Sequence, residues 1–552
     1  MHAARALAIL AALIAITGRA QQKTRVTVQL LAINDLHANL EAATGPNGMV
    51  NGIPAGGVEY LATHLKIAIR ENPDSLVVGA GDLMGASPLI SGLFHDAPTI
   101  EALNAMNLSV TSIGNHELDH GPDDLIRRIH GGCLQPEGCR EGETSPPVRY
   151  SYLAANVVRS ANRAETLLPG TAVRTVAGVK IGFIGETLQG TPQIVSAAFT
   201  RGLEFLEESA VANRAAAQLE REGVHAIVLL IHEGGTQRPA SGPPDPNGCA
   251  NLNGGIIAVA NRLSPAIRVV ISGHSHQFYN CEIAGHLVTS AGSFGRLVTR
   301  VNLTIDPATD VINAVSAKNE IVTRDVPKDP AQTAILEKYR PRVRSVAERP
   351  AGSITGEILT TPNEAGESAA GDVIADAHLA SVAAADKGGA VIAFMNPGGI
   401  RAPLTGKPRP DGTREVSYND LFTVQPFGNR ITVVTMTGDM IRRLLEQQFR
   451  AQGRRAMLEV SNGFTYRYKL NAPPGEHIVP GSIMLNGAPI LPADKVRVEA
   501  IDFMITGGGG YTAFAEGTDN TPGPLDIDAV VEYFAGHSPV APGPKNRIVR
   551  VD

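Results

Sequence analysis

Short apolar runs alternate with amphipathic stretches from residue 25 to about residue 325. The runs are rich in Val, Ile and Leu, as buried strands are, and the stretches between them carry apolar residues at helical spacing. This alternation predicts an α/β domain built in layers. The predicted strands are Val26–Ile33, Leu76–Val78, Val110–Ile113, Val179–Ile184, His225–Ile231 and Ile267–Ile271, and the predicted helices are Gly57–Glu71, Thr99–Met106 and Glu207–Arg221.

A second α/β region follows from about Pro350 to the end of the chain. The segment before it, Asp329–Ala347, is charged, flanked by prolines and helical in pattern, which suits a connector. We therefore predict a first domain over residues 26–327, a linker helix over 328–349 and a second domain over 350–552. In the second domain the pattern predicts helices at Ala369–Ala384 and Gly438–Ala451 and strands at Val391–Met395 and Val496–Ile501.

The N-terminus has the pattern of an export signal. Arg5 precedes an apolar run over Ala6–Ile16 and the small-residue segment Thr17–Ala20. This order predicts a secretory signal peptide over residues 1–20, with a buried first helix as the alternative. The run is shorter than the roughly 20 residues that a membrane span needs, and no later stretch is long and apolar enough. We expect a periplasmic or secreted protein without a membrane span.

The charge balance argues against one class of partner. The chain has 48 basic and 54 acidic residues, a net charge of −6, which becomes −8 if residues 1–20 are removed with Arg5 and Arg19. Binding to a nucleic-acid polymer depends largely on phosphate neutralisation by Lys and Arg, so no such partner is expected. Hydrophobic residues make up 43% of the chain, enough to bury real cores, and the 58 glycines and 37 prolines predict many turns.

The chain has four cysteines, an even number that suggests disulfides in an oxidising compartment. Four cysteines allow three pairings. Proximity along the chain favours Cys133 with Cys139 and Cys249 with Cys281. A zinc–thiolate site is the alternative, although no C-x-x-C spacing occurs.

Polar side chains of metal-binding type follow five of the predicted strands. In layered α/β sheets ligands bind at the carboxyl ends of the strands, so these segments can converge on one site. Taken singly, each is an ordinary turn, a helix cap or a core histidine, but five such segments together favour a shared metal site. The segments are Asn34–His37, Gly79–Asp82, Gly114–Asp119, His232–Gly234 and Gly273–His276.

The types of side chain fit two divalent cations. Imidazole suits zinc, iron or nickel, and carboxylate and amide oxygens suit harder ions such as manganese. Two cations roughly 3.5–4 Å apart would clamp the attacking and leaving oxygens of an in-line displacement, and a bridging water would be deprotonated near neutral pH and attack phosphorus. Asp82, on a glycine-rich turn, is the natural bridging carboxylate. The expected cofactors are two divalent metal ions, Zn, Mn or similar.

These motifs resemble those of the calcineurin-like metallophosphatases, and in particular the exported 5′-nucleotidase/UDP-sugar hydrolase family. The D-x-H, G-D, G-N-H-E-x-D, H-E and G-H-S-H blocks stand in the family's order. In the second region, Asn396–Arg401 and Gln425–Asn429 look like the family's C-terminal nucleotide-binding domain. The resemblance covers nearly all of residues 26–552. It implies a four-layer α/β/β/α first domain, a helical linker and a second α/β domain that binds substrate.

The resemblance also implies roles for individual residues. His116 matches the family's catalytic histidine, oriented by Asp119. A His three residues before an Asp can be hydrogen-bonded within one turn, which fixes the ring tautomer and raises its basicity. Asp35, His37, Asp82 and His276 match the ligands of one metal, and Asp82, Asn115, His232 and His274 match those of the other.

In the second domain the resemblance implies a nucleotide site. Arg401 matches the arginine that grips phosphate, a task that suits the guanidinium fork. Phe427 and Phe503 match the pair that sandwiches the base, where stacking is worth about 1–3 kcal/mol, and Asn396 matches a base-contacting position. The alternative is that both phenylalanines are core residues.

The chain departs from the family pattern in three places. His276 stands where relatives have a glutamine ligand, and it is still a good donor. Gly509 stands where relatives carry an aspartate that holds the ribose hydroxyls. Residues 351–400 contain no arginine, only Lys387, where relatives have one or two. We expect weaker binding of nucleoside 5′-monophosphates and a complete metal site.

The leading interpretation is an exported dimetal phosphohydrolase that converts nucleotides, its small-molecule partners, to nucleoside and phosphate by attack of a metal-bound hydroxide. The alternatives among enzymes are a 2′,3′-cyclic phosphodiesterase/3′-nucleotidase or UDP-sugar hydrolase, and a thiosulfohydrolase, which the aromatic pair disfavours. The remaining alternative is a non-catalytic nucleotide-binding surface protein. Such a protein would be expected to have lost some metal-binding side chains, whereas all seven metal positions here hold suitable ones. The family also implies a rotation between the domains. The sequence leaves open the oligomeric state, the native metal and the preferred nucleotide.

Overall fold

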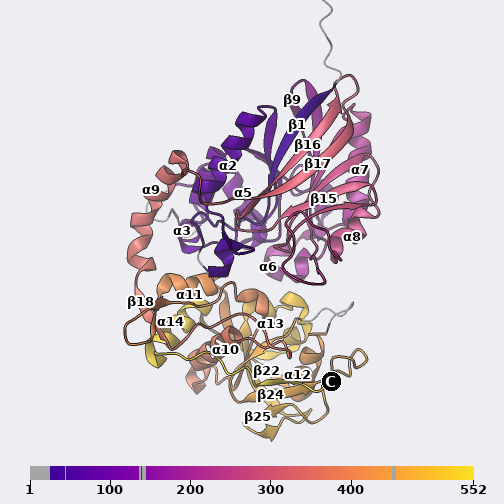
Figure 1. The fold of residues 1–552 in the computed structure, drawn as a ribbon. Coiled ribbons are helices and arrows are strands. Elements are labelled where there is room, and N and C mark those ends of the chain that lie inside the picture. Colours follow the sequence, from indigo (N-terminus) through magenta and orange to yellow (C-terminus); the bar gives the residue numbers. More distant parts are fainter. Residues whose placement is uncertain (1–24, 44, 136–137, 140–143, 450–455) are drawn as a thin grey trace, which may run out of the picture.

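The computed structural model describes residues 25–552 except 44, 136–137, 140–143 and 450–455. The chain forms two lobes, the first indigo to salmon and the second orange to yellow in Figure 1. Helix α9 (Pro330–Ala347) runs along one side from the first lobe towards the second. The signal peptide predicted over residues 1–20 lies outside the described residues.

The first of two six-stranded sheets in the upper lobe brings three motif-bearing strands together. Its strand order is β17 (Val311–Ile321), β16 (Leu297–Asp306), β1 (Val26–Ile33), β4 (Ser75–Ala80), β5 (Leu108–Ser112) and β6 (Ser151–Leu153). β1, β4, β5 and β6 are parallel, whereas β16 and β17 are antiparallel additions. The carboxyl ends of β1, β4 and β5 therefore lie side by side at one edge.

The second sheet has the same design. Its strand order is β14 (Phe278–Ile283), β15 (His286–Ala291), β13 (Ile267–Ser272), β12 (Ala226–His232), β10 (Val179–Thr187) and β9 (Thr171–Val176). β10, β12, β13 and β15 are parallel, and the edge strands β9 and β14 are antiparallel. The two motif-bearing strands of this sheet, β12 and β13, are again neighbours.

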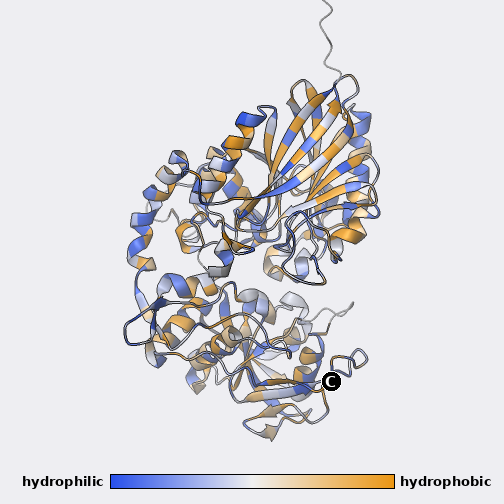
Figure 2. Ribbon diagram, in the orientation of Figure 1, coloured by the Kyte–Doolittle hydropathy of each residue, from blue (hydrophilic) through white to orange (hydrophobic). Residues whose placement is uncertain are grey.

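The two sheets pack face to face over an aliphatic core that includes Val28, Leu230 and Ile271, all fully buried. Helices α2 (Val58–Glu71), α4 (Ala97–Ala105) and α9 share a core with the outer face of the first sheet. Helices α7 (Glu208–Arg221) and α8 (Gly255–Ala260) cover the second (Figure 1). Strands covered on both faces read as continuous apolar runs, as β12 does. The antiparallel strands β16 and β17 instead alternate orange with blue and white segments in Figure 2. The predicted four-layer α/β/β/α architecture is confirmed.

The second lobe is also α/β, as predicted. Its main sheet has the order β23 (Glu459–Val460), β19 (Ile392–Met395), β27 (Lys495–Ile501), β22 (Arg430–Thr437) and β28 (Thr518–Leu525). Its helices include α10 (Ala369–Val382), α11 (Tyr418–Val424), α12 (Gly438–Glu446), α13 (Asp502–Ile505) and α14 (Asp526–His537). Two smaller sheets complete the lobe. The first has the order β18 (Pro350–Ile354), β21 (Arg414–Ser417) and β20 (Lys407–Pro408), and the second has the order β26 (Ala488–Pro489), β25 (Met484–Leu485), β24 (Phe464–Tyr468) and β29 (Ile548–Arg550).

The connector begins with a defined cap. The side chain of Asp329 accepts hydrogen bonds from the backbone N–H groups of Ala331 and Gln332, which closes the first turn of α9. Leu336 and Tyr339 then bury against the first lobe. The helical connector is therefore as predicted, and the exact domain limits at residues 327 and 350 remain a prediction.

One helix is shorter than its pattern suggests. The prediction over Gly438–Ala451 is wrong at its C-terminal end, because α12 stops at Glu446. From there the backbone bonds tighten to three-residue spacing, with Phe449 N–H donating to Glu446 O. The side chain of Gln448 donates to Leu445 O and accepts from the backbone N–H of Leu458. The end of the helix is therefore hydrogen-bonded to a side chain and not to a further helical turn. Ala451 itself lies outside the described residues.

The cysteines pair as predicted, in disulfides Cys133–Cys139 and Cys249–Cys281. The second disulfide ties the loop after β12 to β14, next to the segment that carries His276. Among the described residues, none of the helices combines the length and the apolar character needed to cross a membrane.

The inter-sheet core predicts a stability effect that can be measured. Replacing fully buried Leu230 by alanine should destabilise the first lobe by about 2–5 kcal/mol, because the cavity left between two sheets cannot collapse fully. Denaturant unfolding of Leu230→Ala against the parent chain measures this. Leu491→Ala, at a side chain 57% exposed, is the matched control and should change stability by less than about 0.5 kcal/mol. If both variants lost the same free energy of unfolding, the packing of Leu230 between the two sheets would be contradicted.

Candidate functional site

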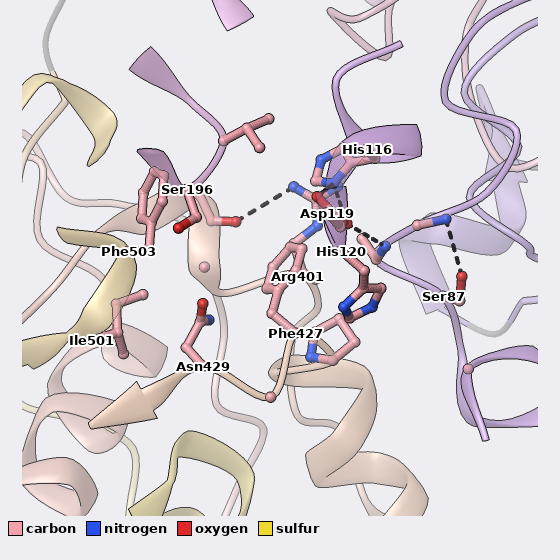
Figure 3. Close-up of a pocket in the computed structure, with 18 of the residues that line it drawn as sticks. Ser87, His116, Asp119, His120, Ser196, Arg401, Phe427, Asn429, Ile501 and Phe503 are labelled. Atoms are coloured by element: carbon pink, nitrogen blue, oxygen red, sulfur yellow. Dashed lines mark hydrogen bonds and ion pairs between the residues drawn. The ribbon is translucent and has the colours of Figure 1, made fainter. Parts of the chain in front are cut away.

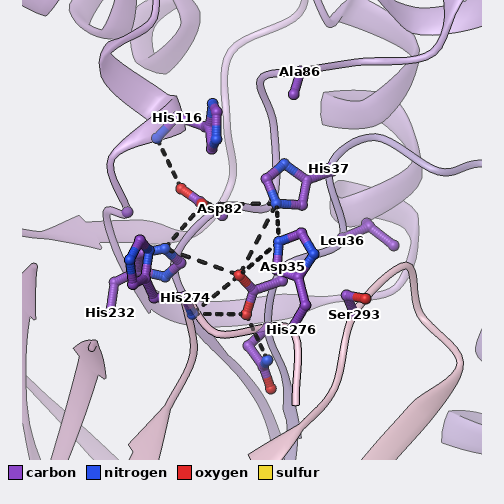
Figure 4. Close-up of polar contacts among 12 residues, drawn as sticks. Asp35, Leu36, His37, Asp82, Ala86, His116, His232, His274, His276 and Ser293 are labelled. Carbon is purple, nitrogen blue, oxygen red and sulfur yellow. Dashed lines mark hydrogen bonds and ion pairs between the residues drawn. The ribbon is translucent and has the colours of Figure 1, made fainter. Parts of the chain in front are cut away.

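The five motif-bearing strand ends of the first lobe converge on one cluster of carboxylates and imidazoles (Figure 4). The turns that follow the strands are sharp. Five site residues adopt left-handed backbone with φ between 47° and 69°, namely Asp35, His37, Asp82, His274 and His276. Such a conformation costs about 1–3 kcal/mol each for residues other than glycine, and it concentrates at functional sites. Here it turns the side chains back towards a common centre.

One group of possible ligands consists of Asp35, His37 and His276, whose donor atoms all lie within 4.8 Å of one another. His37 Nε2 lies 2.9 Å from His276 Nε2, and His276 Nε2 lies 3.5 Å from Asp35 Oδ1. Asp35 is fully buried and held by Asn34 Nδ2 and by the backbone N–H of His274. The structure thus brings together three of the four residues predicted for one metal, and the fourth, Asp82, has Oδ2 3.7 Å from His37 Nε2.

A second group consists of Asp82, His232 and His274, again within 4.8 Å of one another. Asp82 Oδ2 lies 2.9 Å from His232 Nε2. Asn115 joins this group, with its Oδ1 3.1 Å from His274 Nδ1. All four residues predicted for the other metal are therefore adjacent, and Asp82 lies between the two groups as expected of a bridge.

The hydrogen bonds of the histidines test whether a cation fits. His37 Nδ1 lies 3.0 Å from Gly85 O, and His232 Nδ1 lies 2.8 Å from Ala80 O, so each Nδ1–H donates to a carbonyl. When the ring is neutral, Nε2 then carries a lone pair, which lies close to His276 Nε2 in His37 and to the Asp82 carboxylate in His232. A cation placed among these atoms could accept the lone pairs and balance the carboxylates, so the donor set fits metal ions.

The protonation tendencies of the cluster agree with this. Burial holds the pKa of His37 and His276 well below their ordinary value and lowers that of His274 to about 3, which keeps these rings neutral and able to ligate. Burial raises the pKa of Asp35 to about 7. Against the effect of burial, Asp82 and Asp35 raise the pKa of His232 to about 10. The cluster attracts positive charge, as a proton or as a cation.

His116 lies beside the cluster and is held by two carboxylates. Its Nδ1 lies 2.9 Å from Asp119 Oδ2, and its backbone N–H donates to Asp82 Oδ1 at 2.8 Å. Burial would lower the pKa of the ring, but Asp119 and Asp82 raise it above its ordinary value. His116 could also be grouped with His37 and Asp82 as a ligand set, since their donor atoms lie within 4.8 Å of one another. The structure confirms the predicted His116–Asp119 contact.

A cavity of about 890 Å³ lies between the lobes and reaches the cluster (Figure 3). From the first lobe it is lined by Asn115, His116, Asp119 and His274, and from the second by all four predicted substrate residues, Asn396, Arg401, Phe427 and Phe503. The Phe427 ring stacks on His116, with centroids 5.7 Å apart and planes 17° apart, and Arg401 Cζ lies 5.7 Å from the Phe427 centroid. Both phenylalanines therefore face the cavity, although Phe503 also packs on the core of its lobe.

The departure at Gly509 lies in the wall of the same cavity, beside the rings of Tyr511 and Phe503. Gly509 has φ +67°, and a Cβ there would meet the ring of Tyr511 at 3.0 Å. The first lobe supplies a further wall that the sequence did not indicate, since Ile194 and Ser196, between β10 and α6 (Ala197–Thr200), line the cavity with Phe503. These residues carry no motif, and only the approach of the two lobes places them here.

Known proteins share both parts of this arrangement. A calcineurin-like phosphoesterase family model matches residues 28–278, and a 5′-nucleotidase C-terminal domain model matches residues 350–516. A cell wall protein of Listeria monocytogenes is 32% identical over 540 residues, covering 92% of this chain and 67% of its own length.

The chain belongs to the calcineurin-like phosphoesterases that carry a C-terminal 5′-nucleotidase domain.

Two further proteins match most of this chain. An endonuclease of Bacillus subtilis is 30% identical over 536 residues, covering 95% of this chain and 41% of its own length. The chain thus spans about two thirds of one curated relative and less than half of the other. The crystal structure of a 5′-nucleotidase precursor from Thermus thermophilus superposes with a TM-score of 0.76 at 22% identity, covering 96% of this chain and all of that one, and shows the same fold. As a member of its family, this phosphoesterase is a metal-dependent phosphoric ester hydrolase.

Motif analysis missed one buried residue that shapes the site of this phosphoesterase. Glu117, between His116 and Leu118, is fully buried, and its carboxylate accepts four backbone N–H groups. The donors are those of Asp82 and Gly114 to Oε2, and of Leu83 and Met84 to Oε1. Glu117 therefore holds the turn of Asp82 against the turn of Asn115. The signal in the sequence was an acidic residue directly after the site residues Asn115 and His116.

We predict that Glu117→Gln lowers the affinity of this phosphoesterase for zinc or manganese by about 10–100-fold, because one amide oxygen cannot accept four N–H groups. Titration calorimetry on the metal-stripped full chain measures the affinity. Glu165→Ala, which removes a carboxylate 55% exposed on the surface, is the control and should bind metal like the parent. Unchanged affinity of Glu117→Gln would show that the turns hold their geometry without this carboxylate.

Proposed function

We propose that the protein is an exported, 5′-nucleotidase-like phosphohydrolase that uses two divalent cations to convert nucleotides to nucleoside and phosphate. The observation that carries this proposal is the shared cavity. Phe427, Phe503 and Arg401 of the second lobe line the same space as His116, Asn115 and His274 of the first. An aromatic base between the phenylalanines would place its phosphate towards the metal cluster.

We assign Asp35, His37, Asp82 and His276 to one cation and Asp82, Asn115, His232 and His274 to the other. Bound there, the cations would supply an ionised water at neutral pH and offset charge on the phosphoryl group. The chain's own part is to hold these ligands rigidly: Gly85 O and Ala80 O orient the rings of His37 and His232, and Asn34 orients Asp35. Preorganised ligands need no rearrangement as the reaction proceeds.

We assign His116 as the catalytic residue that touches the reacting phosphate. Asp119 accepts a hydrogen bond from Nδ1–H, which fixes the ring and leaves Nε2 for a substrate oxygen. Because Asp119 and Asp82 raise its pKa, His116 can carry a proton near neutral pH and donate it to a phosphoryl oxygen or to the leaving group. Arg401 adds a second positive group beside Phe427, within the field of Asp82 and Asp119.

The nucleotide side of the assignment rests on three groups. Phe427 and Phe503 would stack on the base, and Asn396, whose Oδ1 is buried without a hydrogen-bond partner among the described residues, would accept a base N–H. Gly509 offers no carboxylate to ribose hydroxyls, so we expect modest affinity for nucleoside 5′-monophosphates. The runner-up activities are those of a 2′,3′-cyclic phosphodiesterase/3′-nucleotidase or a UDP-sugar hydrolase.

We further propose that the protein acts outside the cytoplasm, in the periplasm or as a secreted protein. Two disulfides favour an oxidising compartment. A relative named as a cell wall protein is consistent with an extracytoplasmic location. The pattern of residues 1–20 supports export.

A substrate panel tests the proposed activity. The full chain loaded with manganese or zinc should release phosphate from AMP, and a chelator should abolish the release because the cluster then lacks its cations. The products from AMP, UDP-glucose, 2′,3′-cyclic AMP and p-nitrophenyl phosphate would be separated by chromatography and compared: nucleoside and phosphate from AMP, UMP and glucose 1-phosphate from UDP-glucose, a nucleoside monophosphate from the cyclic nucleotide, and p-nitrophenol and phosphate from p-nitrophenyl phosphate. Preference for UDP-glucose or the cyclic nucleotide would favour the runner-up, and no turnover of any of the four would overturn the proposal.

Replacing His116 separates catalysis from metal binding. His116→Ala should lower kcat for AMP by about 10²–10⁴-fold, the usual contribution of a positioned acid or base, while bound metal stays at the parent level. Metal content is measured by elemental analysis of the same samples. His225→Ala, at an exposed histidine outside the cavity, is the control and should keep full activity. Loss of metal together with activity would instead make His116 a ligand.

A further inference from the structure

Beneath the aromatic wall of the cavity, the second lobe buries a chain of polar side chains that the proposed mechanism does not use. His378, on α10, is fully buried, and its Nε2 lies 3.0 Å from Gln425 Oε1. Its other ring nitrogen, Nδ1, lies 3.4 Å from Oε1 of Glu499, which is also fully buried. One imidazole thus joins three segments that are far apart in the sequence.

Gln425 follows α11 and begins the loop that carries Phe427 two residues later. Its side chain is fully buried, with Nε2 3.8 Å from Met395 Sδ. Directly before it, the carbonyl of Val424 accepts the backbone N–H of Arg401 at 2.8 Å. The contact with His378 therefore fixes the start of the Phe427 loop at the point where Arg401 is also anchored.

Glu499 belongs to β27, and this strand leads directly into Phe503 in α13. Within the described part of the chain, neither carboxylate oxygen of Glu499 has a well-formed hydrogen bond. Its Oε1 atom contacts the ring of His378. Burial raises the pKa of Glu499, and Glu499 raises the pKa of His378 against the effect of burial. The two groups stabilise a proton between them and so hold α10 to the strand that carries Phe503.

The far end of the Phe427 loop is held by a separate set of hydrogen bonds. Asn429 donates both its backbone N–H and its Nδ2–H to Oδ2 of Asp526, at 3.1 and 3.0 Å. The backbone N–H of Asp526 donates back to Asn429 O at 2.8 Å. The loop that carries Phe427 is therefore fixed at both ends, by Gln425 before it and Asn429 after it.

A buried chain of this kind is not explained by stability, since apolar residues of similar volume often stabilise a core as well or better. We infer that His378 is a positioning residue: by contacting Gln425 and Glu499 together, it sets the distance between Phe427 and Phe503 and thereby the affinity for the flat part of the substrate. This inference rests on the proposed function, in which that flat part is a nucleobase.

The test is direct binding of adenosine to the metal-loaded full chain by titration calorimetry, which needs no turnover. His378→Asn retains a donor near the Nδ1 position and loses the contact with Gln425, whereas His378→Gln retains a donor near the Nε2 position. The Gln variant loses the contact with Glu499 instead. We expect each variant, which lacks one of the two contacts, to bind adenosine roughly tenfold more weakly, the effect of one lost buried hydrogen bond. KM for AMP should rise in the same ratio, with kcat for glycerol phosphate unchanged.

Tyr468→Phe is the matched control, because it removes a buried hydrogen bond, Tyr468 Oη to Ala365 O, elsewhere in the same lobe. It should bind adenosine like the parent. If the parent binds adenosine and both His378 variants bind it as well as the parent does, the positioning role is wrong while the proposed function stands. If the parent itself does not bind adenosine, the nucleotide assignment fails and this inference fails with it. A fall in kcat for glycerol phosphate would assign His378 a merely structural role.

Discussion

The structure depends on one constraint: two carboxylates and several imidazole rings are buried together where the two sheets meet. Asp35 and Asp82 are removed from water at the carboxyl ends of parallel strands, and burial of an uncompensated carboxylate is costly. The surrounding chain is arranged to hold them there: strained left-handed turns aim the side chains inward, and Glu117 collects the N–H groups of two turns. The negative charge of these buried carboxylates is balanced when a positive charge enters the site, which is the physical basis for metal dependence.

The division of the chain into two lobes follows from the same constraint. A site that holds cations rigidly has little room to recognise an organic group, and in the proposed function recognition falls to the second lobe, which lines the other side of the cavity. Phe427 stacks on His116 across the boundary, and Arg401 lies beside that ring. The cavity between the lobes therefore belongs to neither domain alone, and its walls include segments such as Ile194 and Ser196 that have no part in the metal cluster.

Much of the site could be predicted because its parts lie at the ends of strongly apolar strands. Strands covered on both faces read as unbroken apolar runs, and the polar residues that interrupt them, such as Asp35, Asp82 and His232, stand out against that background. The His116–Asp119 contact is local, within one turn, and so is visible as a spacing. Contacts between distant segments leave no such spacing. The role of Glu117 and the end of α12 at Glu446 depend on partners elsewhere in the chain, which periodicity does not report.

The sequence by itself therefore determined the layered α/β class, favoured the pairing of neighbouring cysteines and singled out the candidate metal-binding side chains, because each depends on local pattern and residue chemistry. The tertiary structure decided which of those side chains lie together, since only the stacking of two sheets brings Asp82 between His37 and His232. It also decided that Phe427 and Phe503 face a cavity rather than a core, and that His378 joins the segments carrying them. These are distances between segments far apart in the chain, and they are fixed by packing.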